Sequence, residues 1–290
     1  TGVDGLAALL GAPDPREQER RERELILDYL HYCWALDRAV KFKQVEFKSD
    51  QLANLFVDVS GVGGAPDLLR AVPGKQPLPR MNAMAGHLLD ARCSPTVLIQ
   101  AVPGQGKSTV VQYVCQAHRA SLLGRDELQQ DSEAVPEDVP AVGRVPFRID
   151  LAAYAKWVEG GDPFAHDDQA PKRKRRRRCD VELFLVEHVA DAMPGRQVTE
   201  ELINGWLERY PTLVACDGLD EVALPVRGQV VELIEKFATR WASGRKTDRR
   251  TDPKVVRCQV IVTTSPTGSM STQTGPLSAP SPSSRVSTSA

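Results

Sequence analysis

Apolar positions near the start of the chain recur with the period of an α-helix. They fall close to one face of a 3.6-residue repeat, at Ile26, Tyr29, Leu30, Cys33, Trp34 and Leu36. Asp14 and Pro15 precede them, and these residue types favour the N-cap and the first helical position. The pattern predicts an amphipathic helix that begins near Pro15, within a mostly helical segment at residues 1–92.

The remainder of that segment is less regular. Residues 52–57 have the apolar character of a short strand or of a helix end. The glycines at 61–64 are expected to break this element, because glycine weakens both helices and strands. Pro73, Pro77 and Pro79 then indicate a loop.

From about Cys93 onward, short apolar runs alternate with helical patterns. The runs predict buried strands at residues 96–99, 145–150, 212–216 and 260–263. Between and after them, helical patterns cover residues 108–119, 180–192, 199–210 and the apolar positions from Val230 to Trp241. Such alternation is typical of an α/β fold, a parallel sheet covered by helices on both faces.

Composition limits the classes of protein that the chain can belong to. It has 290 residues, 41% apolar and 26% charged, with a net charge of -1. That is enough apolar material for a core, and the charge gives no global attraction to nucleic acid or anionic lipid. Apolar runs stay well short of the ~18 residues of a membrane helix. The chain starts at Thr1 and shows no signal segment, so we expect a fragment of a soluble, cytoplasmic protein.

The six cysteines do not follow the spacing of a metal site or a disulfide framework. They form no CxxC pair, and several lie in apolar segments, as Cys216 does. The six are Cys33, Cys93, Cys115, Cys179, Cys216 and Cys258. We therefore expect small buried side chains in a reducing compartment.

The strongest chemical signal follows the first predicted strand and opens a helix. The segment reads Ala101, Val102, Pro103, Gly104, Gln105, Gly106, Lys107, Ser108 and Thr109. It matches the phosphate-binding pattern GxxxxGK[ST], except that Ala101 replaces the first glycine. The glycines allow main-chain amides to surround phosphate oxygens, and the helix start adds positive potential. Lys107 is expected to reach the β- and γ-phosphates, and the Ser108 hydroxyl to ligate Mg²⁺.

A second signal ends the third predicted strand. Asp217 follows its last apolar residue, and Asp220 and Glu221 come three and four positions later. Asp217 suits the Walker B role of holding Mg²⁺ beside the nucleotide. Three acids so close together repel one another unless a cation lies among them, which argues for a metal. Asp220 or Glu221 could orient or deprotonate the attacking water. Ser265 follows the fourth predicted strand, where a polar side chain could sense the γ-phosphate.

Taken together, the motifs resemble the NACHT family of P-loop NTPases, in the STAND class of signal-transducing ATPases, in a bacterial, actinomycete-like form. The resemblance lies in residues 103–109, 145–151, 216–222 and 260–264, and covers about 93–268. It implies an α/β P-loop NTPase core of the ASCE type, preceded by a helical segment. It also implies that the fourth strand lies between the first and third.

Carried over residue by residue, the resemblance assigns Lys107 and Ser108 to phosphate and Mg²⁺, Asp217 to Walker B, and Asp220 with Glu221 to hydrolysis. Relatives commonly have an arginine before the proline that follows the fourth strand, whereas this chain has Ser265 before Pro266. Relatives also continue into a lid and sensor domains, whereas residues 269–290 are rich in Ser, Thr and Pro and are expected to be disordered. We therefore hypothesise a truncation or a reading-frame change near Pro266.

Three functions remain open from the sequence. The favoured one is a switch for signalling or antiviral defence that binds ATP or GTP with Mg²⁺, hydrolyses it slowly and self-associates in its full-length form. A second is a nucleotide-binding module or remnant without turnover. A third is a nucleic-acid-dependent ATPase that uses the basic run at residues 172–178. No aromatic residue interrupts that run, and acids lie nearby at Asp162, Asp167 and Asp168, which favours a solvated loop instead.

Overall fold

A computed structural model describes a sheet between two layers of helices. It covers residues 15–37, 56, 58–64, 80–81, 83–90, 93–124, 128, 135–164, 178–242, 257–266 and 284–288. The strands are β1 (Gly61–Gly64), β2 (Arg80–Met81), β3 (Thr96–Gln100), β4 (Val145–Asp150), β5 (Thr212–Asp217), β6 (Cys258–Thr264) and β7 (Ser284–Thr288). The helices are α2 (Pro15–Asp37), α4 (Met84–Leu89), α5 (Lys107–Leu123), α7 (Leu151–Val158), α8 (Val181–Ala192), α9 (Glu200–Arg209) and α10 (Leu224–Trp241), with a 3₁₀ turn η2 (Leu219–Glu221).

The strands of the sheet lie in the order β2-β1-β7-β3-β6-β5-β4. Strands β3, β6, β5 and β4 are parallel, so their carboxyl ends share one edge. The expectation that the fourth predicted strand lies between the first and third is confirmed, because β6 pairs with both β3 and β5. An α/β fold with a parallel sheet is likewise confirmed.

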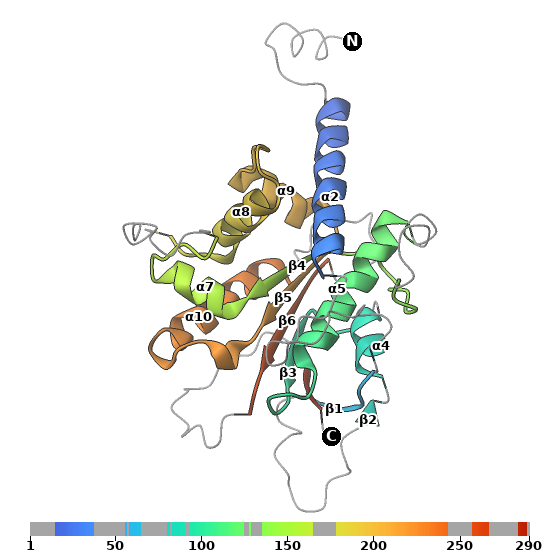
Figure 1. The fold of residues 1–290 in the computed structure, drawn as a ribbon, viewed down its shortest axis with the longest axis vertical. Helices are drawn as coiled ribbons and strands as arrows, with labels where there is room; N and C mark the ends of the chain where they lie inside the picture. The colour runs from blue at the N-terminus through green and yellow to red at the C-terminus, as the bar shows by residue number, and fades with distance from the viewer. Residues whose placement is uncertain are drawn as a thin grey trace, which may run out of the picture.

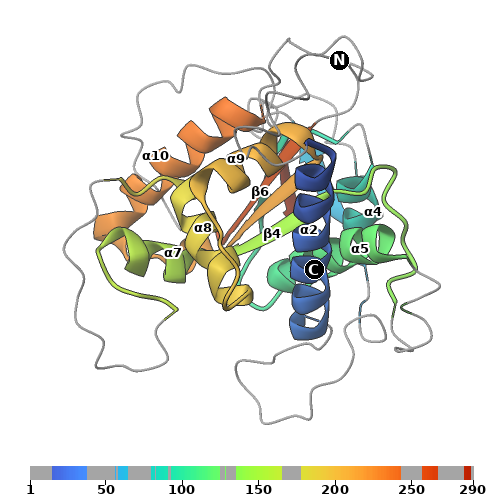
Figure 2. The same cartoon turned by 90° about the horizontal axis from the view of Figure 1, so that it is seen from above.

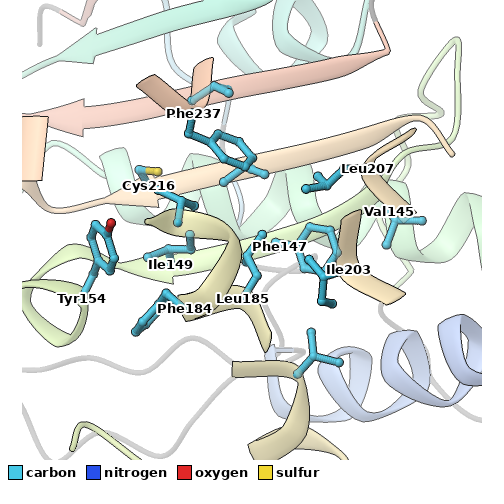
Figure 3. Packing of buried hydrophobic residues seen from close by; sticks show 14 of the residues in the cluster. Val145, Phe147, Ile149, Tyr154, Phe184, Leu185, Ile203, Leu207, Cys216 and Phe237 are labelled. Atoms are coloured by element: carbon cyan, nitrogen blue, oxygen red, sulfur yellow. The ribbon is translucent and has the colours of Figure 1, made fainter. Parts of the chain in front are cut away.

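Helices cover both faces of the sheet (Figures 1 and 2). On one face, α4 and α5 bury Val97, Leu213 and Ile261. On the other, α7, α8, α9 and α10 enclose a larger cluster that includes Phe147 and Cys216. Figure 3 shows this cluster, in which side chains from β4 and β5 meet those of the helices above them. The alternation follows from strand geometry, since neighbouring residues of a strand point to opposite faces.

Helix α2 belongs to the same core. It begins at Pro15, as predicted, and packs beside α5 and α8 near the β4 end of the sheet (Figure 2). Tyr29 and Leu30 are buried on its predicted apolar face, but Leu36 is 48% exposed, so the prediction was wrong for that residue. The carboxyl end of α2 at Asp37 thereby reaches helix α5, where Gln112 donates to the Asp37 main-chain oxygen.

Two expectations about irregular segments were wrong. The glycines at 61–64 do not end an element but form strand β1, which pairs with β2 and β7. Residues 284–288 of the tail expected to be disordered form β7, which pairs with β3 and β1. Neither sequence has the short apolar run by which we recognised the other strands. The remainder of 269–290, residues 52–55 and 57, and the proline-rich stretch at 73–79 lie outside the described residues.

Other sequence expectations concern cysteines and membrane spans. All six cysteines are free thiols and five are buried, with Cys179 half-buried, which confirms that they pack as small side chains. Burial raises the pKa of the Cys216 thiol to about 12, which makes it a poor nucleophile. Within the described parts of the chain, no helix is both long and apolar enough to cross a bilayer.

Candidate functional site

The glycine-containing turn at residues 101–106 links β3 to α5 at the carboxyl edge of the sheet. Gly104 and Gly106 have φ values of 85° and 75°, a left-handed conformation that favours glycine over any residue with a Cβ. Gly106 accepts a hydrogen bond from the Val110 amide at 2.9 Å and so starts the helix, but no described side chain caps α5. The first amides of α5 therefore lack an acceptor from a described cap side chain and could donate to an external anion.

Lys107 folds back over this turn. Its side chain is buried, and Nζ donates to the carbonyl oxygen of Ala101 at 2.8 Å and to Oγ of Ser265 at 3.1 Å. A third contact joins Nζ to the carbonyl oxygen of Val102 at 3.4 Å. The ammonium thus links the glycine-containing turn to the end of β6.

Ser108 and Asp217 meet as the sequence predicts. The Ser108 hydroxyl donates to Oδ1 of Asp217 at 3.0 Å. Thr263 on the neighbouring strand β6 donates to the same oxygen at 2.7 Å and accepts a hydrogen bond from the Gly218 amide at 2.8 Å. Asp217 is 9% exposed. The carboxylate is therefore fixed at the end of β5, facing the first turn of α5.

Asp220 lies on the other side of Lys107. Ser265 donates to its Oδ2 at 2.5 Å, while its Oδ1 is buried and accepts no hydrogen bond within the described part of the chain. Burial raises the pKa of Asp220, but the Ser265 hydrogen bond and the Lys107 charge outweigh it and leave that pKa below its ordinary value. The group is therefore a carboxylate at neutral pH, with one oxygen free for a further donor.

The 3₁₀ turn that carries Asp220 is held from α10. Arg227 donates to the carbonyl oxygens of Asp220 at 3.0 Å and Val222 at 2.8 Å. Gly218, with φ 84°, lets the chain reverse directly after Asp217. Glu221 follows Asp220 in this turn and is exposed, so only one of the two candidate catalytic acids lies beside Lys107.

The repulsion argument for a metal was wrong in its premise. The three acids do not converge on one point, because Asp217 is neutralised by its own partners, Asp220 lies against Lys107 and Ser265, and Glu221 faces solvent. Across the described residues, no group of three or more His, Cys, Asp or Glu side chains forms a metal cage. Any metal here would need oxygens from outside the protein, as is usual for Mg²⁺ bound with phosphates.

Sequence reasoning missed two basic residues of the site. Arg148 on β4 donates to Oδ2 of Asp217 at 3.2 Å and to Oδ1 of Asp37 at 3.4 Å. Arg119 on α5 is buried and donates to Oδ2 of Asp37 at 2.8 Å. One signal was available, since Arg148 is a charged residue inside an otherwise apolar strand. Its partner Asp37 lies 111 residues away in sequence, which no local pattern indicates.

The remaining predicted phosphate-binding residues lie around the turn. Pro103 and Gly104 are exposed at its tip, and Thr109 is half-buried in the first turn of α5. Gln105 uses Oε1 to accept a hydrogen bond from the Val102 amide at 3.2 Å, which stabilises the turn from within. The basic run at 172–178 lies outside the described residues except for Arg178, which pairs with Asp180 and Glu200.

A cavity of about 530 Å³ lies elsewhere, between the first half of α2 and the start of α9. The two arginines that line it already have acidic partners, because Arg21 pairs with Glu17 and Arg209 with Glu22. The carboxyl edge of the sheet remains the candidate site. Neither a scan of protein-family models nor a search of curated proteins found a match to this chain.

Proposed function

We propose that the chain binds a nucleoside triphosphate with Mg²⁺ and hydrolyses it slowly, as a nucleotide-controlled switch of the NACHT type. One observation carries the proposal: the Ser108 hydroxyl lies 3.0 Å from Asp217, directly beside uncapped amides of a left-handed glycine turn. A glycine turn without a ligand-binding role would not require a carboxylate such as Asp217 beside Ser108. The strand order β3-β6-β5-β4 agrees with the order that the resemblance implies.

The groups present fit a magnesium–polyphosphate ligand. The amides at the start of α5 and the Lys107 ammonium supply positive charge for phosphate oxygens. The Ser108 hydroxyl and the Asp217 carboxylate are hard oxygen donors on neighbouring elements, a set that suits Mg²⁺ together with phosphate oxygens and water. When bound, Mg²⁺ would neutralise charge that develops on the phosphates.

Each residue of the candidate site then has a definite role. The turn amides bind and orient the phosphates. Lys107 exchanges its contacts with Ala101 and Ser265 for a phosphate oxygen, which its flexible stem allows. Asp220, a carboxylate with Oδ1 free, accepts a hydrogen bond from a water molecule and orients it for attack. Ser265 holds Asp220 in place through Oδ2.

Nucleotide binding is tested by titration with mant-ATP and mant-GTP, each with Mg²⁺ and with EDTA. We expect the wild type to bind and K107A to lose at least about tenfold in affinity, because a charge-assisted contact of ~1.5–3 kcal/mol disappears. K236A is the matched control, since Lys236 is exposed on α10 and pairs with Glu232. Equal affinity in wild type and K107A would overturn the proposal.

Turnover is a separate question, because the second candidate function is binding without hydrolysis. It is favoured by the end of β6, where Ser265 and Pro266 follow Thr264 and no arginine is present. Phosphate release under single-turnover conditions separates the two. Slow release in the wild type that D220A abolishes supports the switch. Binding with no release in either protein supports the inert module.

A further inference from the structure

Arg148 lies between two carboxylates of different elements. Its guanidinium donates through Nη2 to Asp217, at 3.2 Å, and through Nη1 to Asp37, at 3.4 Å. Both contacts are long for charge-assisted hydrogen bonds, which are usually about 2.7–2.9 Å. The group is thus shared between the end of β5 and the end of α2 and bonded tightly to neither.

Asp37 is also held by α5. Oδ2 accepts from buried Arg119 at 2.8 Å, and its main-chain oxygen accepts from Nε2 of Gln112 at 2.7 Å. Helix α5 is the one that opens with Lys107 and Ser108. A continuous line of hydrogen bonds therefore runs from Ser108 through Asp217, Arg148 and Asp37 to Arg119.

The same guanidinium contacts the one oxygen of Asp217 that Ser108 and Thr263 leave open. Oδ1 of Asp217 already accepts from Ser108 and Thr263, and Oδ2 accepts from Arg148. A divalent cation near this carboxylate would repel the guanidinium. The Asp37 carboxylate is a second anion within reach of Arg148, so the positive charge of the guanidinium would keep an acidic partner.

We propose that Arg148 competes with Mg²⁺ for Asp217 and moves onto Asp37 when the metal binds, so that the metal site and the carboxyl end of α2 are coupled. This inference rests on the proposed nucleotide function. It makes Arg148 a positioning residue that sets metal affinity. By linkage, Mg²⁺ binding strengthens the attachment of α2 in the wild type, and the attachment of α2 strengthens Mg²⁺ binding by the same factor.

The first test measures the Mg²⁺ affinity of each protein at saturating mant-ATP. R148Q removes the competitor, and we expect Mg²⁺ to bind at least about tenfold more tightly, or about 1.4 kcal/mol. D37N leaves Arg148 with Asp217 as the one anion among its described partners, and we expect weaker Mg²⁺ binding. R240Q is the matched control, because Arg240 pairs with Glu182 at the far end of α10.

A second readout follows α2 itself. We expect Mg²⁺ added to the wild-type nucleotide complex to slow hydrogen exchange of peptides that cover residues 29–37, and this effect to vanish in R148Q. Unchanged Mg²⁺ affinity in R148Q, or the same slowing of exchange in R148Q and wild type, would overturn the coupling. The coupling would also be overturned if R148Q and D37N changed the Mg²⁺ affinity in the same direction.

Two controls keep these outcomes distinct. D37N leaves buried Arg119 with Gln116 as its remaining described side-chain partner, so its fold is first checked by circular dichroism. If D37N is unfolded, the comparison of R148Q with the wild type decides whether the coupling exists. A wild type that binds no mant-ATP refutes the proposed function and the coupling with it, whereas a wild type that binds but shows no difference from R148Q refutes the coupling alone.

Discussion

Thr263 serves two groups of the site with one hydroxyl. It donates to Asp217 and accepts from the Gly218 amide, and it is fully buried. The hydroxyl therefore fixes the carboxylate and the main-chain reversal that follows it. A side chain of the same shape without the oxygen would leave both partners without this contact.

T263V tests that role. We expect it to lower the free energy of unfolding by about 1–3 kcal/mol, because a buried amide loses its acceptor. Nucleotide affinity should fall with it, as Asp217 loses one of its anchors. T264V is the control, since the Thr264 hydroxyl contacts only the Ser265 carbonyl oxygen among described partners, at 3.3 Å. Equal urea-unfolding free energies for the two variants would contradict the role.

Two histidines, buried His118 and half-buried His188, make stability depend on pH. Burial lowers the pKa of His188 from 6.5 to about 4 and that of His118 to about 3. Below pH 6.5 the unfolded chain binds protons that the folded protein does not accept until near pH 4 or pH 3. Stability therefore falls as pH drops through this window.

The prediction is tested by urea unfolding at pH 7 and pH 5. Each of the two histidines should account for about 2 kcal/mol of the free energy of unfolding that is lost between pH 7 and pH 5. The reason is that a tenfold difference in proton affinity between the folded and unfolded states corresponds to about 1.4 kcal/mol. H188Q should remove its share and so show a smaller loss than the wild type. H31Q is the control, because His31 is exposed on α2. A wild type equally stable at both pH values would refute the prediction.

At the scale of elements, α2 is part of the same fold as the sheet and not an appendage to it. Tyr29 is fully buried and its ring lies 5.6 Å from that of Phe147 on β4 and 6.4 Å from that of Trp206 on α9. The helix thereby covers the meeting point of the sheet and α9. This packing, together with the ion pairs of Asp37, attaches α2 along its length.

Y29A should therefore destabilise the whole fold. Truncating a buried aromatic side chain typically costs about 3–5 kcal/mol. Y32A on the same helix should change the free energy of unfolding by less than about 0.5 kcal/mol, because Tyr32 is 43% exposed. Denaturant unfolding of both variants gives the comparison. Similar values for the two would mean that α2 does not pack on this core.

At the scale of the whole molecule, the sheet joins distant parts of the chain. Strand β7 lies between β1 and β3 and pairs with both. It runs parallel to β3 and antiparallel to β1, so it connects the amino-terminal strands to the parallel core. Without it, β3 would have an unpaired edge beside the glycine-containing turn at residues 101–106.

Removing residues 284–290 tests this connection. We expect a lower melting temperature, faster hydrogen exchange in β3 and concentration-dependent aggregation, because an open strand edge pairs with other chains. Removal of residues 289–290 alone, which follow β7, is the matched control. Unchanged exchange in β3 after the longer deletion would show that β7 contributes nothing to the sheet.

The core of the fold was predictable because its strands are apolar and bounded by turn residues. Ser108 and Asp217 could be placed together since the ends of parallel strands share one edge. Helix α7 was missed because it begins directly after β4 with no glycine or proline between them, and Asp150 itself caps it. Arg148 and Asp37 could not be paired, because their contact depends on how α2 packs against the finished sheet.

The place of β7 also affects how the chain is made. The ribosome synthesises β7 after every other described strand of the sheet, so in a nascent chain both edges of β3 are open until β6 is made and one stays open until β7 follows. On a polysome, many such edges lie close together. A chaperone that binds extended segments could bind β3 in this state. Slow release of β3 would then delay its pairing with β7.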